Sequence, residues 1–197
     1  MNKILGGAMR CGKTTLAKNI CLETNLTRLS SDLIRKKIRS QLEKDSSHPL
    51  FAWSTIDSLR GSAWEKKHSE NTDELVNLFI NEATALQTFI KKEINDTKGD
   101  FLLEGSHILP RFALTVTDIA HITYVIDSSP DQFERVARAQ KSPDKDFHYV
   151  QAWSYFNRAY GKYLQKQCKL YGIRCFDIAD MGFEKTMATV AATLTTK

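Results

Sequence analysis

The sequence predicts an α/β fold in which about five parallel strands form one sheet with helices on both faces. Three observations support this prediction. Short apolar runs alternate with longer stretches of helical periodicity, a glycine-rich loop joins the first apolar run to the first helical stretch, and 197 residues suit a single domain. Parallel strands need crossover connections that are usually helical, so this alternation is typical of a doubly wound sheet. Ligands in such folds bind beyond the carboxyl ends of the strands.

The first third of the chain contains two strand–helix units. Residues 4–5 form a short apolar strand, and residues 15–22 follow with helical periodicity. Residues 27–30 are predicted to form the second strand. A helix over 32–42 comes next, with Ser31 as its expected cap.

The middle of the chain begins with a less regular region. Residues 45–70 are interrupted by Ser, Pro and Gly but contain Trp53 and Trp64, so we expect a substrate-binding insertion there. Apolar residues at steps of three and four then predict a long amphipathic helix over 75–94. The apolar run over 100–105 predicts a buried strand that ends in an acid.

The last part of the chain continues the alternation. We expect a strand over 119–127, a helix that begins at Pro130, a long helix over 153–168, a strand over 173–178 and a final helix over 183–194.

The strongest motif is a phosphate-binding loop. Residues 7–14 match the pattern G-x-x-x-x-G-K-[ST] between a strand and a helix. The glycines permit tight backbone geometry, so successive N–H groups and the helix N-terminus can face phosphate oxygens. The lysine can reach the β- and γ-phosphates of ATP, and the threonine hydroxyl can bind Mg²⁺. We therefore expect the nucleotide to be bound by Gly7, Ala8, Met9, Arg10, Cys11, Gly12, Lys13, Thr14 and Thr15.

Composition limits the remaining function classes. A net charge of +5 favours anionic ligands but is too small to favour nucleic acid as a partner. No apolar run reaches the roughly 18–20 residues that a membrane helix needs, and the start lacks a secretory leader, so we expect a cytoplasmic protein. Four cysteines without metal-ligand spacing predict neither disulfides nor a zinc site. The oligomeric state is not predicted.

Two acids compete for the role of organising Mg²⁺. Glu104 and Asp127 each end an apolar strand, where such an acid is expected. The position of the two acids by itself leaves both open.

Three segments resemble the small-molecule P-loop kinases. They are the loop at 7–14, the segment Ser30-Ser31-Asp32-Leu33-Ile34-Arg35, and the segment Glu104-Gly105-Ser106-His107-Ile108-Leu109-Pro110. The last is similar to the Glu-Gly-x-His-x-x-Pro segment of 2-phosphoglycerate kinases and related predicted kinases. The later elements also follow in a similar order, whereas residues 45–70 match nothing in these families. The resemblance implies a P-loop NTPase fold and ATP-dependent phosphoryl transfer. It also favours Glu104 over Asp127 for Mg²⁺, because in these kinases the relevant strand lies beside the loop strand and the run that Glu104 ends is the better match.

The resemblance also implies roles for individual residues. Asp32 corresponds to an acid that orients or deprotonates the acceptor hydroxyl; alternatively, it only stabilises a helix N-terminus. Arg135 and Arg138 correspond to arginines of a lid near 135–150 that contact the nucleotide and the transferring phosphoryl group. The alternative is that both are exposed helix residues.

Further acceptor-binding candidates follow from their positions. Arg35 lies one helical turn from Asp32 and could hold an anionic acceptor, unless it only belongs to the solvated basic run over 35–39. His107 and Arg111 follow Glu104 and are expected to contact the same acceptor, unless they are surface residues without a function.

These observations together predict an ATP- and Mg²⁺-dependent kinase. Its acceptor is expected to be a small, anionic molecule with a hydroxyl group. Two alternatives stay open: a kinase that acts on nucleotides or nucleic-acid ends, and a nucleotide-binding switch without catalysis.

Overall fold

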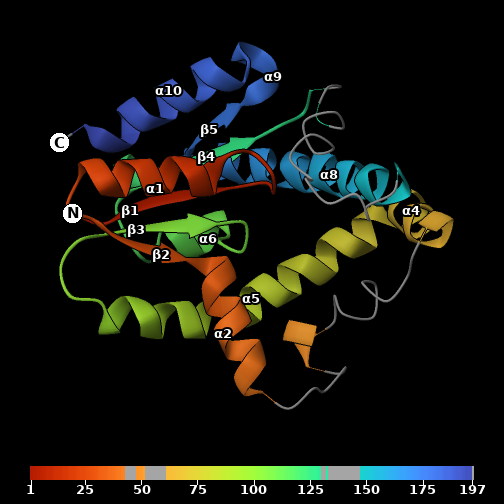
Figure 1. The fold of residues 1–197 in the computed structure, drawn as a ribbon, viewed down its shortest axis with the longest axis horizontal. Coiled ribbons are helices and arrows are strands. Elements are labelled where there is room, and N and C mark those ends of the chain that lie inside the picture. The colour runs from red at the N-terminus through yellow and green to blue at the C-terminus, as the bar shows by residue number, and fades with distance from the viewer. Residues whose placement is uncertain (43–47, 52–60, 130–131, 133–146, 197) are drawn as a thin grey trace.

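The computed structural model describes residues 1–42, 48–51, 61–129, 132 and 147–196 (Figure 1). All strand pairs in it are parallel, and the sheet order is β2-β3-β1-β4-β5. The strands are β1 (Lys3–Gly7), β2 (Thr27–Ser30), β3 (Phe101–Gly105), β4 (Ile122–Ile126) and β5 (Arg174–Asp177). The longer helices are α1 (Lys13–Glu23), α2 (Ser31–Gln41), α4 (Gly61–Glu70), α5 (Thr72–Asp96), α8 (Phe147–Tyr171) and α10 (Phe183–Thr195). Four short helices complete the described part: η1 (Pro49–Phe51), α6 (Pro110–Ala113), η2 (Ile119–His121) and α9 (Ile178–Met181).

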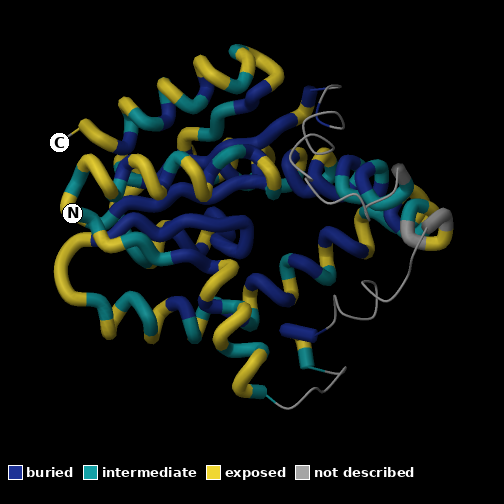
Figure 2. The backbone as a smooth tube through the Cα atoms, in the orientation of Figure 1, coloured by how far each residue is buried: buried dark blue, intermediate teal, exposed yellow. Residues whose placement is uncertain are grey.

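Helices cover both faces of the sheet. α1 packs against α10 on one face, and α8 packs against β4 and β5 on the other, with α5 and α6 beside it (Figure 1). The three central strands β1, β3 and β4 are therefore buried along their whole length, whereas the edge strands β2 and β5 are partly exposed (Figure 2). This explains why the central strands are largely apolar and do not alternate apolar with polar residues.

An aromatic cluster joins α5 to α8. The ring centroid of Phe79 lies 4.9 Å from that of Tyr160 and 5.5 Å from that of Phe156, and both contacts are edge-to-face. All three side chains are buried. Each such pair contributes about 0.5–1.5 kcal/mol beyond the burial of its surface. The cluster holds α5 in place, and α5 also carries the buried Glu82.

The fold confirms the predicted α/β class and the five parallel strands, and it corrects several details. Residues 61–70 form α4, although Gly61 and Ser62 suggested an interruption; these residues lie in the first turn of the helix. Ser31 does not cap α2 but is its first residue. Its buried hydroxyl packs against Gly105 of β3, where a Cβ atom would overlap it, and it has no hydrogen-bond partner among the described residues. The start of the helix expected at Pro130 lies outside the described residues.

None of the helices in the described ranges is both long enough and apolar enough to cross a lipid bilayer.

Candidate active site

The glycine-rich loop connects the carboxyl end of β1 to the start of α1. Gly7 has a φ of +140°, and a Cβ atom there would overlap the Val125 carbonyl oxygen of β4. Gly12, with a φ of +77°, is the N-cap residue of α1. Only glycine adopts such conformations readily, which explains both glycines of the motif. Cys11 is buried and its thiol lies 3.4 Å from the Met9 carbonyl oxygen.

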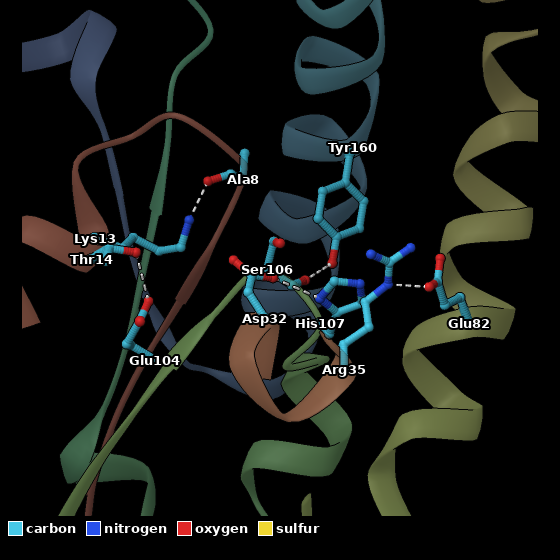
Figure 3. Close-up of polar contacts among 10 residues, drawn as sticks. All are labelled: Ala8, Lys13, Thr14, Asp32, Arg35, Glu82, Glu104, Ser106, His107 and Tyr160. Carbon is cyan, nitrogen blue, oxygen red and sulfur yellow. Dashed lines mark hydrogen bonds and ion pairs between the residues drawn. The ribbon is translucent and has the colours of Figure 1, made fainter. Parts of the chain in front are cut away.

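Lys13 and Thr14 face the inside of this loop. The Lys13 ammonium group is buried and donates a hydrogen bond to the Ala8 carbonyl across the loop (Figure 3). The Thr14 hydroxyl donates to Glu104 Oε2 over 3.1 Å. β3 lies directly beside β1, which places Glu104 opposite Leu5 and close to the start of α1.

The oxygen atoms near Thr14 suit a magnesium ion. Glu104 is fully buried, and its Oε1 accepts no hydrogen bond from the residues that the structure describes, with Arg28 3.8 Å away. A hydroxyl and a carboxylate are the hard oxygen donors that Mg²⁺ prefers. Asp127, in contrast, accepts hydrogen bonds from the backbone N–H and the hydroxyl of Ser129 at 3.1 and 2.7 Å. The geometry thus favours Glu104 over Asp127 as the acid near the loop.

A cavity of about 740 Å³ opens in front of the loop. Residues 9–15 line one end of the cavity. The other end is lined by side chains from α2, α5, α8 and the loop after β3, among them Asp32, Arg35, Glu82 and His107. Its volume lies in the range of small-molecule sites.

Asp32 and His107 are hydrogen-bonded to each other. His107 Nδ1 lies 3.1 Å from Asp32 Oδ1 (Figure 3). The partial loss of water around the Asp32 carboxyl would by itself raise its pKa, but the hydrogen bond and charge of His107, together with Lys13 and Arg35, outweigh this effect and lower the pKa. Asp32 is therefore an ionised acceptor at neutral pH, so the histidine nitrogen is the donor.

Two tyrosines hold the loop that carries His107. Tyr160 donates to the Ser106 carbonyl over 2.6 Å, and Tyr124 donates to the Ile108 carbonyl over 2.8 Å. Burial raises the pKa of both hydroxyls, so they remain protonated donors. The His107 ring also packs on the Phe79 ring, with 4.6 Å between the ring centroids. The backbone on both sides of the histidine is thus held in place.

Arg35 forms an ion pair that the sequence did not reveal. Its Nε donates to Oε1 of Glu82, a fully buried residue of α5 (Figure 3). The sequence did indicate that Glu82 is unusual, because it is an acid on the otherwise apolar face of this helix. The interpretation of Arg35 as part of a solvated run is wrong, since its side chain is only 22% exposed.

Not every predicted residue reaches the cavity. Arg111 lies exposed on α6 and does not line it, because Pro110 begins a short helix that buries Phe112 and Ala113 and turns Arg111 toward solvent. The expectation that Arg111 contacts the acceptor therefore finds no support in the lining of this cavity and stays a prediction. Arg135 and Arg138 lie outside the described residues.

Comparison with solved structures shows the same fold elsewhere. The chain is similar to an uncharacterized protein from Eubacterium ventriosum ATCC 27560, with 13% identity, 97% and 96% of the two chains covered, and a TM-score of 0.51. It is also similar to shikimate kinase from Bacteroides thetaiotaomicron, with 14% identity, the same coverage and a TM-score of 0.51. A deoxyadenosine kinase from M. mycoides with bound dATP aligns over 100% of both chains at 11% identity and a TM-score of 0.47.

The sheet order, the glycine-rich loop and the match to the shikimate kinase structure identify the α/β P-loop NTPase fold. No protein-family model matches the chain, and no curated protein sequence matches it.

Proposed function

We propose that this protein is an ATP-dependent kinase that transfers the γ-phosphoryl group of Mg-ATP to a hydroxyl group of a small molecule. One observation carries the proposal: the phosphate-binding loop and the ionised Asp32 open into the same cavity. Lys13 and Asp32 both line this cavity, so a phosphoryl group bound at the loop and an acceptor hydroxyl can share one space. This arrangement disfavours a switch without catalysis.

Binding of the nucleotide is assigned to the loop. Its backbone N–H groups, the N-terminus of α1 and the Lys13 ammonium group supply positive potential for the triphosphate. Arg10 adds a cation at the cavity wall. Thr14 and Glu104 would hold Mg²⁺, which neutralises charge on the phosphate oxygens when bound. We retain Arg135 and Arg138 as predicted lid arginines.

Asp32 is assigned to the acceptor hydroxyl. The hydroxyl oxygen forms a bond to the γ-phosphorus, the bond to the β–γ bridging oxygen breaks, ADP leaves, and the hydroxyl proton passes to the Asp32 carboxylate. A weak base suffices, because positioning and charge stabilisation dominate phosphoryl transfer. The hydrogen bond from His107 orients the carboxylate for this step.

The experiment compares three variants by calorimetry with Mg-ATP and by phosphoryl transfer to a panel of sugars, hydroxy acids, nucleosides and oligonucleotides. Lys13→Ala should lower transfer about 100-fold or more, because it removes a charge that acts on the transferring group. Asp32→Asn should still bind ATP but lose most transfer. Lys18→Ala, which removes an exposed lysine from the same helix, is the matched control and should behave as wild type.

Two outcomes would contradict the proposal. If the wild-type protein does not bind ATP, the proposed kinase function is wrong. ATP binding without transfer to any acceptor would favour the nucleotide-binding switch.

A further inference from the structure

The end of the cavity away from the loop carries an unused hydrogen-bond acceptor. Oε1 of Glu82 is bound by Arg35, but Oε2 is buried and has no hydrogen-bond partner among the described residues. The Glu82 side chain is only 1% exposed, although the residue lines the cavity. A buried carboxylate oxygen without a partner is costly, so a bound molecule that donates an N–H or O–H group there would be stabilised.

The charges at this end do not suit an anion. The charged side chains that line the described cavity are Arg10, Lys13, Arg35, Asp32, Glu82 and Glu104. Arg10 and Lys13 belong to the loop to which the nucleotide is assigned. The remaining cation, Arg35, is paired with Glu82 and lies near Asp32. Among the described residues, an anionic acceptor would therefore meet two carboxylates, while Arg35 is paired with Glu82 and the His107 ring with Asp32. Like charges in a partly buried site repel strongly.

The same end has an aromatic wall. Phe79 of α5 and Tyr149 and Trp153 of α8 line the cavity. Tyr149 and Trp153 are half-buried, with ring centroids 6.2 Å apart. Partly exposed aromatic rings bind flat or apolar faces of a ligand.

We infer that the acceptor is an uncharged, ring-bearing alcohol, such as a nucleoside. It would present a hydroxyl to Asp32, an N–H or O–H donor to Glu82 Oε2 and a ring face to Tyr149 and Trp153. This inference rests on the proposed kinase function and replaces the expectation of an anionic acceptor, which depended on the net charge and on Arg35, His107 and Arg111. Glu82 becomes the residue that excludes anions.

The test uses matched pairs of acceptors that differ in charge. Nucleosides are compared with the corresponding nucleotides that keep the same free hydroxyl, and glucose is compared with glucuronate. Phosphoryl transfer is measured as kcat/KM, and binding is measured by calorimetry with a non-hydrolysable ATP analogue present. We expect the neutral member of a pair to be preferred about 10-fold or more in both measurements.

Glu82→Gln tests the residue itself. The substitution removes the negative charge and leaves Arg35 without its ionic partner, so the preference should shift at least about 10-fold toward anionic acceptors while ATP affinity is unchanged. Glu93→Gln is the matched control, because Glu93 also joins α5 to α2 by an ion pair, with Lys37, but does not line the cavity. It should not alter the preference.

The outcomes separate the two proposals. Wild-type protein that binds ATP but prefers the anionic member, or that takes no neutral member, overturns the acceptor inference and leaves the nucleotide site intact. Protein that does not bind ATP overturns both. The wild-type comparison decides the question even if Glu82→Gln does not fold.

Discussion

The substitution His107→Leu tests how Asp32 is held. Leucine fills a similar volume and keeps an apolar contact with Phe79, but it removes the donor that lies 3.1 Å from Asp32 Oδ1. The carboxylate then loses the hydrogen bond that orients it and the main contribution to its low pKa. We expect a slower reaction and a changed pH dependence.

The magnitude follows from the geometry. A hydrogen bond to a charged group contributes about 1.5–3 kcal/mol. The Asp32 side chain is 58% exposed, so water replaces part of the lost bond, and we take about 1–2 kcal/mol. This corresponds to about a 5- to 30-fold fall in kcat/KM.

The direction of the pH effect follows from the sign of the pKa shift. Asp32 acts in its ionised form, which is present above its pKa and is lost as the pH falls through it. The pKa is lowered in the wild type, so activity should persist into acid; in His107→Leu the pKa rises, and the acid limb moves to higher pH. The assay is a profile of kcat/KM against pH, with the most active acceptor of the panel.

A conservative variant separates orientation from packing. In His107→Asn the side-chain amide can take the place of Nδ1 and donate to Asp32, so activity and the acid limb should return most of the way to wild type. The assignment is refuted if His107→Leu retains wild-type kcat/KM and an unshifted acid limb, or if asparagine performs no better than leucine.

Two further predictions concern the scaffold and are measured by urea unfolding. Tyr160→Phe leaves a buried carbonyl of the loop after β3 without its donor and should lower the free energy of unfolding by about 1–3 kcal/mol. For the half-buried Tyr163, the same substitution should lower it by less than about 0.5 kcal/mol. Gly105 has a φ of +143°, and a Cβ atom there would overlap Ser31, so Gly105→Ala should lower the free energy of unfolding by about 3 kcal/mol or more. Gly99→Ala, at φ +79° in open space, should cost about 1 kcal/mol. Equal costs within either pair would contradict the contacts described.

Some features of the site left only a weak trace in the sequence. Glu82 is an acid on an apolar helical stripe, which is unusual, but its partner could not be identified from that pattern. Arg111 and His107 both follow Glu104 in the sequence, but the helix that begins at Pro110 turns Arg111 toward solvent and away from the cavity. Both outcomes depend on which faces of the helices become buried.

The sequence by itself determined the five strands, the longer helices other than α4 and the phosphate-binding loop. These features depend on residues close together along the chain: the apolar periodicity sets the strands and helices, and two glycines permit the loop geometry around Lys13. Only the tertiary structure decided which side chains meet in the cavity. Asp32 and His107 are 75 residues apart, and Arg35 and Glu82 are 47 apart. Such pairs form because β2 and β3 are neighbours in the sheet and α5 packs beside α2, and local patterns do not specify that packing.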